Sequence, residues 1–228
     1  MSKKANTQPI ITPDTTAIRK GIEAFLASKD KKGNKIGLAQ YGVYAFFDYY
    51  GEPIYVGQTE ERIGTRIRRH LTNQRTDAVA MRVLDPQEVA EVEVWPIDMA
   101  GKTDKEIKVL LGQCEYTVYK YVLATSRLKA VLNEKDIPVT KIVTLPDSFR
   151  SRIVPEPVYS NRKHADIRIA RRAGQISELA KIVTERKVSK GLRRTLYQQA
   201  RRLEALAKER FEQIVNSSDP QDEDTAEE

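Results

Sequence analysis

Two short apolar runs separated by a turn constrain this fold more than any other feature of the sequence. Gly42-Val-Tyr-Ala-Phe-Phe and Pro53-Ile-Tyr-Val-Gly are rich in β-branched and aromatic residues, and Tyr50-Gly51-Glu52 lies between them. Such runs joined by a glycine-containing turn are typical of a β-hairpin. Val89 to Trp95 places valine and glutamate at period two, as expected of a half-buried third strand. The sequence therefore predicts an α+β fold with a small mixed or antiparallel three-stranded sheet.

Helices are expected on both sides of these strands. Apolar residues in 17–28 recur at helical spacing, and Thr59 is expected to cap a helix that runs to about Leu71. Thr103 and Glu106 have the spacing of a capping box, which opens a longer helix. The predicted sheet is thus flanked by helices, one of them N-terminal to the strands.

The basic residues are concentrated toward the C-terminus. The net charge is only +7, but residues 141–215 hold 18 basic and 8 acidic residues, whereas residues 216–228 hold six acids and no base. Apolar steps of three and four predict a helical hairpin in 161–215 with arginines facing outward: Arg168, Arg171, Arg172, Arg193, Arg194, Arg201 and Arg202. Such a basic surface favours nucleic acid as the partner.

These patterns divide the chain into five segments. They are an N-terminal helical extension (1–37), a core (38–137), a Pro-rich linker (138–160), the basic helical hairpin (161–215) and an acidic tail (216–228) that is expected to be disordered. The tail would serve either as a solubilising end or as a competitor for the basic surface.

Composition excludes several classes of protein. No apolar run approaches the ~20 residues of a membrane span, and the N-terminal residues lack the apolar stretch of a signal peptide. One cysteine and two histidines cannot build an internal disulfide or a structural zinc site. We therefore expect a cytoplasmic protein with no membrane partner.

Five polar residues have types and positions that suit phosphodiester cleavage. Tyr44 and Tyr55 lie on the predicted hairpin, Arg66 and His70 lie one turn apart on the next helix, and Glu115 interrupts the apolar face of the capped helix. The planar guanidinium group suits phosphate oxygens. A carboxylate on an apolar face is costly unless a cation or a donor meets it. A magnesium ion held by one carboxylate and several waters is the kind of site expected beside a phosphate substrate.

The order of these residues resembles the GIY-YIG nuclease superfamily. Its two signature tripeptides correspond to Gly42-Val43-Tyr44 and, after ten residues, Tyr55-Val56-Gly57, with valine in place of isoleucine in both. An arginine and a histidine on one helix, a glutamate on a later helix and a closing asparagine follow in the family order: Arg66, His70, Glu115 and Asn133. The Arg66 and His70 arrangement is most similar to the type II restriction endonucleases of this superfamily, and the match covers about residues 40–133.

The resemblance implies a metal-dependent DNA endonuclease with a single catalytic centre. The implied catalytic residues are Tyr44, Tyr55, Arg66, His70 and Glu115, with Glu115 as the ligand of one Mg²⁺ or Mn²⁺ ion. Gly42, Gly57 and Asn133 would have structural roles. The residues expected to contact double-stranded DNA are Arg62, Arg69, Arg193, Arg194, Arg201 and Arg202.

The two tyrosines would have different roles. A phenol with a pKa of about 10 is a poor base at neutral pH. Tyr44 could activate water only if His70 took its proton or the metal favoured the phenolate. Tyr55 would orient the phosphate through its hydroxyl group.

Each residue also has a simpler interpretation. Tyrosines in strands often belong to the core, a histidine on a basic helix is usually solvated, and Arg62, Arg66 and Arg69 could form a surface stripe. Glu115 could be paired with a lysine. Two departures from the family pattern also stand out: Gln58 follows Gly57 where many relatives carry lysine, and the eighteen residues from Glu115 to Asn133 exceed the expected spacing.

Restriction-type cleavage is the function that these features favour. A double-strand break by one centre per chain predicts a homodimer or sequential nicking, and a restriction enzyme implies a cognate methyltransferase that acts on the same site. The alternatives are a homing- or repair-type nicking nuclease and a non-cleaving DNA-binding module that uses the basic hairpin. Arg66 and Glu115 favour cleavage, because binding alone needs no carboxylate beside the phosphate.

Overall fold

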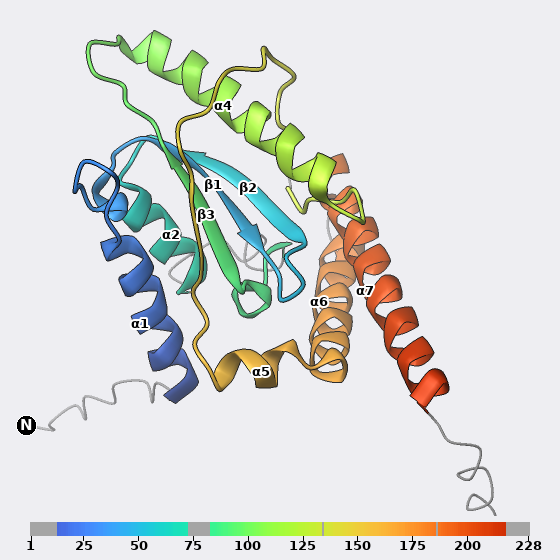
Figure 1. Ribbon diagram of the computed structural model, residues 1–228. Coiled ribbons are helices and arrows are strands. Elements are labelled where there is room, and N and C mark those ends of the chain that lie inside the picture. The colour runs from blue at the N-terminus through green and yellow to red at the C-terminus, as the bar shows by residue number, and fades with distance from the viewer. Residues whose placement is uncertain (1–12, 73–82, 134, 186, 218–228) are drawn as a thin grey trace, which may run out of the picture.

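A computed structural model describes residues 13–72, 83–133, 135–185 and 187–217. The elements follow in the order α1 (Pro13–Ala27), η1 (Ile36–Leu38), β1 (Gly42–Phe47), β2 (Pro53–Thr59), α2 (Ile63–Leu71), η2 (Pro86–Glu88), β3 (Glu91–Pro96), α4 (Asp104–Thr125), β4 (Phe149–Arg152), α5 (Val158–Lys163), α6 (Ala165–Glu185) and α7 (Lys190–Ser217). Figure 1 shows the sheet with α4 on one side, α1 and α2 on the other, and the α6–α7 hairpin beside its β2 edge. The fold is therefore α+β, as the sequence predicts.

The sheet has four antiparallel strands in the order β2-β1-β3-β4. The predicted hairpin is confirmed as β1 and β2, with Tyr44 opposite Gly57 and Phe46 opposite Tyr55. The prediction of three strands is wrong, because β4 pairs with the outer side of β3. Three of the four β4 residues are exposed, so this strand carries no apolar alternation that the sequence could reveal. With β4 at one edge, β2 remains the strand at the other.

The expected Pro-rich linker is also wrong as a description of 138–160. This segment contains β4 and the start of α5, and its residues Ile153, Val154 and Val158 are buried in the main hydrophobic cluster. The backbone N–H of Ile153 donates to the carbonyl oxygen of Ala90 at 2.9 Å. The segment therefore completes the core.

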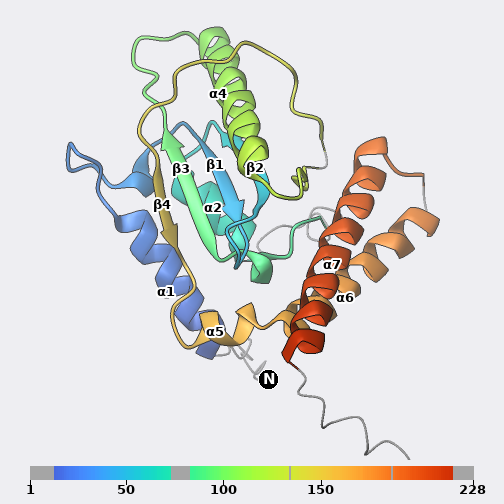
Figure 2. The same cartoon turned by 45° about the vertical axis from the view of Figure 1, so that its right-hand side comes forward.

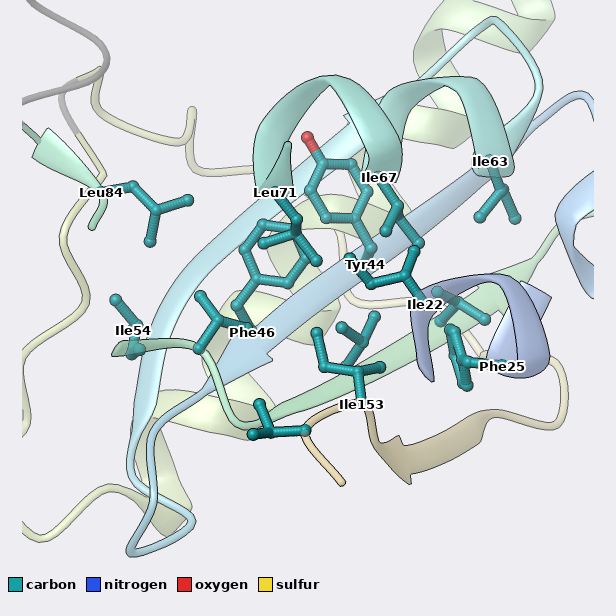
Figure 3. Packing of buried hydrophobic residues seen from close by; sticks show 14 of the residues in the cluster. Ile22, Phe25, Tyr44, Phe46, Ile54, Ile63, Ile67, Leu71, Leu84 and Ile153 are labelled. Atoms are coloured by element: carbon teal, nitrogen blue, oxygen red, sulfur yellow. The ribbon is translucent and has the colours of Figure 1, made fainter. Parts of the chain in front are cut away.

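Both faces of β1 are covered, which explains why its sequence is apolar without alternation. All six of its residues are buried. Tyr44 and Phe46 pack toward α1 and α2 with Ile22 and Ile67, as Figure 3 shows. Val43, Ala45 and Phe47 pack on the opposite face against the apolar stripe of α4, which consists of Cys114, Val118 and Val122. A strand buried on both faces is typically a continuous apolar run.

Of the two helix caps predicted from the sequence, one is present and one is not. Thr103 and Glu106 form the capping box at the start of α4, as predicted. Thr59, by contrast, is the last residue of β2 and does not cap α2, which begins at Ile63 after Arg62. The Thr59 hydroxyl instead donates to the carbonyl of Glu61 and accepts from its backbone N–H. A threonine that closes a turn satisfies local backbone groups as a cap would, so the two have similar sequence patterns.

The helical hairpin of α6 and α7 is present, but not all of its arginines face outward. Arg168, Arg172 and Arg202 are only 0%, 5% and 2% exposed. Their Nη2 atoms donate to one carboxylate oxygen of Asp48, in the β1–β2 turn, at 2.7, 2.9 and 2.9 Å respectively. Burial alone would raise the pKa of Asp48, but the three guanidinium groups hold it below its usual value. These contacts join the hairpin to the sheet. Figure 2 shows α6 and α7 side by side from a second direction.

One hydrophobic cluster extends over segments that the sequence divides. It includes Ile22 of α1, Phe46 of β1, Leu179 of α6 and Leu192 at the start of α7. The N-terminal helix, the sheet and the C-terminal hairpin therefore share a core. The acidic tail beyond residue 217 lies outside the described residues, and no helix in the described part is long and apolar enough to cross a membrane.

Candidate active site at the free edge of β2

The hydroxyl group of Tyr44, on β1, contacts two side chains of α2. The Nε atom of Arg66 donates to this oxygen at 3.2 Å, and Nε2 of His70 lies 2.8 Å from it. Arg66 and His70 are one helical turn apart, so the same face of α2 delivers both. Because the phenol oxygen already accepts from Arg66, its own proton is free to be donated to His70. His70 is only 3% exposed and is therefore not a solvated surface histidine.

Gly57 makes room for this hydroxyl group. Tyr44 lies opposite Gly57 in the hairpin, and a Cβ atom at position 57 would be 2.5 Å from the phenol oxygen. Gly42 has a similar constraint, since a Cβ there would lie 2.8 Å from the carbonyl oxygen of Trp95. Both glycines therefore permit close approaches that any side chain would prevent.

Tyr44 lies behind the accessible surface. It is completely buried, and burial raises its pKa, an effect to which nearby Tyr55 adds and which the charge of Arg66 partly offsets. The phenol is therefore protonated at neutral pH. Figure 3 shows its oxygen pointing toward α2 and away from the core. A base role for Tyr44 consequently depends on its two α2 partners.

A cleft of about 420 Å³ opens beside this group, and three of the predicted catalytic residues line it. They are Tyr55 from β2, Arg66 from α2 and Glu115 from α4. Val83, Leu84, Asn133 and residues 135–138 complete the lining. Arg66 is the residue that connects the two parts of the site, because it lines the cleft and also contacts the Tyr44 oxygen.

In the part of the chain that the structure describes, side chains and a loop, rather than another strand, cover the outer edge of β2. The side-chain amide of Asn133 accepts from the N–H of Val56 at 3.2 Å and donates to its carbonyl at 2.7 Å. The backbone N–H of Leu132 donates to the carbonyl of Ile54 at 2.7 Å. Asn133 thus pairs with β2 as a neighbouring strand would, which satisfies backbone groups at an otherwise open edge.

Glu115 is attached to the same edge. Its carboxylate accepts a hydrogen bond from the backbone N–H of Gln58. Burial raises the pKa of Glu115 to about 7, although this hydrogen bond and the charge of Arg66 both act to lower it. The lysine partner considered from the sequence is not what acts on this carboxylate; the neighbouring cation is Arg66. A desolvated carboxylate facing a cleft favours the entry of a cation.

The donor set suits a cation that keeps most of its waters. Within the described ranges, no three or more His, Cys, Asp or Glu side chains cluster as they would around a metal held entirely by the protein. Mg²⁺ usually retains several waters and takes one or two carboxylates together with substrate phosphates. Glu115 in an open cleft fits that pattern.

The predicted DNA contacts on the surface separate into accessible and engaged arginines. Arg62 and Arg193 are exposed, and Arg201 is half-buried with its guanidinium 5.9 Å from the ring of Tyr197. Arg69 forms two hydrogen bonds to the carboxylate of Glu61, at 2.6 and 2.8 Å. Accessible cationic side chains remain available for phosphate groups, whereas Arg69 would first have to leave its carboxylate.

Two other arginines of the predicted DNA surface have internal partners. Arg202 is buried on Asp48, so the prediction that it contacts DNA is wrong for this conformation. Arg194 forms an ion pair with Asp136 and donates to the carbonyl of Asn133 at 3.0 Å. Helical periodicity could not reveal these contacts, because their partners lie far away in the sequence.

Several cleft residues were missed by the sequence analysis. Lys135 and Asp136 come shortly after Asn133, and only that proximity could have suggested them. Val83 and Leu84 carry no chemical signature, so nothing in the sequence marks them as cleft residues. The chain has Gln58 at the position where many GIY-YIG relatives carry lysine. Lys135, from another segment, nevertheless places a lysine in the lining of the cleft.

Comparison of the chain with protein-family models, with curated proteins and with solved structures gave no match. The resemblance to GIY-YIG nucleases therefore depends on the residues named above and on their arrangement. In that arrangement Tyr55, Arg66 and Glu115 line the cleft at the β2 edge, and Arg66 also contacts Tyr44 of the buried Tyr44–His70 pair.

Proposed function

We propose that this chain is a metal-dependent DNA endonuclease of the GIY-YIG type, with restriction-type cleavage as its reaction. One observation carries the proposal: Arg66 contacts the buried Tyr44–His70 pair and also lines a cleft with Tyr55 and Glu115. A module that only binds DNA has no need of a desolvated carboxylate beside a phosphate-binding arginine. The combination supports hydrolysis of the bound phosphodiester.

The cleft supplies groups that suit a phosphodiester. The guanidinium of Arg66 suits the phosphate oxygens, and Lys135 adds a second positive charge in the lining. Tyr55 lines the same cleft and would orient the phosphate through its hydroxyl. Exposed Arg62 and Arg193 would contact backbone phosphates outside the cleft. Contacts of this kind position the DNA without reading its sequence.

Glu115 would hold one Mg²⁺ or Mn²⁺ ion. Such an ion, when bound, stabilises negative charge on the reacting phosphate. The raised pKa of Glu115 supports this role, because a carboxylate destabilised by burial gains from a nearby cation.

The pair of Tyr44 and His70 would manage the proton of the attacking water. The phenol oxygen is buried behind Arg66, so it would receive that proton only when the water reaches it, and only as its own proton passes to His70 across the 2.8 Å contact. Arg66 stabilises negative charge on the phenol oxygen through its Nε–H. The three side chains would therefore act as one unit, and a change in any of them should lower the rate.

Cleavage of a supercoiled plasmid tests this function. The wild-type chain should produce nicked or linear DNA with Mg²⁺ or Mn²⁺ and none with EDTA. Glu115→Gln should reduce the rate about 100-fold or more, in the range found when a key electrostatic group is removed. Glu204→Gln is the matched control, because Glu204 is exposed on α7. DNA binding without cutting by the wild-type chain would leave only the binding-module alternative.

The products separate the nuclease classes. Discrete fragments from a long DNA would support restriction-type cleavage, whereas single nicks would support the homing or repair alternative.

A further inference from the structure

A polar face of α7 donates hydrogen bonds to backbone carbonyls around the cleft. Arg194 donates to the carbonyl of Asn133 at 3.0 Å, and Gln199 donates to that of Val83 at 3.3 Å. Arg202 donates to the carbonyls of Pro53 and Ala130 at 2.9 and 3.4 Å. Asn133 and Val83 both line the cleft, although they come from different segments. One helix thus contacts two parts of the cleft lining.

Arg194 connects α7 to the β2 edge. One of its Nη atoms pairs with Asp136 and the other donates to the Asn133 carbonyl, so its guanidinium spans two residues of the cleft lining. The side chain of Asn133 in turn holds both backbone groups of Val56. A continuous set of contacts therefore runs from α7 through Asn133 to the strand that carries Tyr55.

Gln199 contacts the opposite side of the cleft lining, at Val83. It is buried, and its amide reaches the carbonyl of Val83. Arg194 and Gln199 are five positions apart on the helix, a rigid spacing of about 7.5 Å along the axis. Arg202 fixes the same helix to Asp48. The distance between the two contacts is therefore set by a regular element that is itself anchored.

We propose that α7 holds the two sides of the catalytic cleft at a fixed separation. Arg194 and Gln199 are the positioning residues for these two sides. Arg194 acts on the Asn133 side and Gln199 on the Val83 side. The inference rests on the proposed nuclease function for its effect on catalysis, but its structural part is independent of that function. It gives the C-terminal hairpin a role in shaping the site, in place of the direct phosphate contact expected of Arg194.

Catalytic and binding measurements on Arg194→Ala in the full chain distinguish the two roles. A positioning residue predicts a fall in kcat of at least about 10-fold at saturating DNA, as expected when a catalytic group is misplaced. The slope of log binding constant against log salt concentration should stay unchanged. A slope reduced by about one with an unchanged kcat would show a phosphate contact and overturn the proposal.

The chain offers a matched control at the other end of the same helix. Like Arg194, Arg210 pairs with an aspartate: it donates two hydrogen bonds to Asp166, at 3.0 and 3.1 Å, and it lies about 24 Å along the axis from Arg194. Arg210→Ala removes an Arg–Asp pair from α7 without touching the cleft, so its kcat should equal that of the wild type. Equal kcat values for the two variants would contradict the proposal that α7 positions the cleft.

Two further measurements keep the test valid if cutting is not observed or Arg194→Ala is unstable. Hydrogen exchange of the Val56 amide should speed up in Arg194→Ala and not in Arg210→Ala, whether or not the chain cuts DNA. Arg194→Lys keeps the charge but loses the fork, so it should reproduce the faster exchange in a milder form. Unchanged Val56 protection in both Arg194 variants would overturn the proposal.

Discussion

The buried phenol of Tyr44 is the residue on which the proposed proton transfer depends. Its hydroxyl group is held between Arg66 and His70, and its pKa is raised by burial. Neither partner alone makes it a base, because Arg66 stabilises the phenolate and only His70 can take the proton. Its function is therefore a property of three side chains rather than of one.

Tyr44→Phe tests that dependence. The variant keeps the ring and removes the oxygen, so we expect cleavage to fall at least about 100-fold, as for loss of a general base. Loss of the buried hydrogen bonds should also cost about 1–3 kcal/mol of stability. Tyr49→Phe is the control, because the Tyr49 hydroxyl bonds the carbonyl of Gln87 at 3.1 Å instead. A rate within about twofold of the wild type would refute the base role.

Glu115 predicts a pH dependence. With a pKa of about 7, its carboxyl group is largely protonated at pH 6 and ionised at pH 8. Protons and metal compete for the ionised form. The Mg²⁺ concentration needed for half-maximal cleavage should therefore fall as pH rises from about 6 to about 8. A Mg²⁺ requirement that does not change over this range would exclude Glu115 as the ligand.

The same raised pKa affects stability without metal. The native chain holds this proton more tightly than the unfolded chain does, so the stabilisation is present at low pH and is lost as pH rises through about 7. Added Mg²⁺ should therefore raise the melting temperature more at pH 8 than at pH 6. Thermal denaturation at both pH values measures the difference.

At the scale of elements, the site depends on how closely the backbone of β2 approaches Tyr44 on β1, whose hydroxyl group contacts α2. A Cβ at Gly57 would lie 2.5 Å from the Tyr44 oxygen, whereas a Cβ at Gly112 in α4 would meet no atom within 4 Å beyond its chain neighbours and the adjacent backbone of its own helix. Gly57→Ala should therefore displace Tyr44 and abolish most cleavage, at a cost of about 1–3 kcal/mol in stability. Gly112→Ala should keep activity and gain up to about 1 kcal/mol as a helix substitution. Plasmid assays and urea unfolding compare the two, and an active Gly57→Ala chain would contradict the proposed geometry.

Much of this arrangement could be predicted from the sequence, for identifiable reasons. The hairpin has two apolar strands with a glycine turn, and Arg66 and His70 share a helix face by their spacing. β4 could not be predicted, because an exposed edge strand needs no apolar pattern. Thr59 was misassigned because a turn and a helix cap place similar demands on a threonine.

The buried arginines could not be predicted either. Arg168, Arg172 and Arg202 meet Asp48 only after α6 and α7 fold onto the hairpin turn. Their sequence pattern is that of a basic helix surface, and nothing local reveals a carboxylate so far along the chain. Lys135 and Val83 became cleft residues for the same reason, since tertiary contacts place them there.

At the scale of the whole molecule, Asp48 joins the C-terminal hairpin to the sheet. Asp48→Asn would remove the charge that three buried guanidinium groups share. Arg168 and Arg172 would keep Glu88 as a carboxylate partner, whereas Arg202 would keep only backbone carbonyls. An uncompensated buried charge is strongly destabilising, so we expect a loss of about 3–5 kcal/mol in the free energy of unfolding. Asp147→Asn is the control, because Asp147 forms a single exposed ion pair with Lys31 and should cost about 1 kcal/mol or less. Urea unfolding of both variants measures the contrast, and equal losses would show that the buried cluster is not a stabilising joint.

The lowered pKa of Asp48 also gives this joint a pH dependence. Its contribution to stability is present above the pKa of an unfolded aspartate and is lost as pH falls through the lower native value. The wild-type chain should therefore lose stability in acid, and the Asp48→Asn chain should lose less. Unfolding curves between about pH 5 and pH 2 compare them.

The central claim is that the cleft at the β2 edge cuts DNA. The most direct measurement is single-turnover cleavage of supercoiled plasmid by the wild-type chain in Mg²⁺, beside Arg66→Ala at saturating DNA. Arg66 contacts Tyr44 and lines the cleft, so the account predicts nicked or linear product from the wild type and at least about 100-fold slower cleavage by the variant. Plasmid that stays supercoiled with the wild type in both Mg²⁺ and Mn²⁺, or equal rates for the two chains, would contradict it.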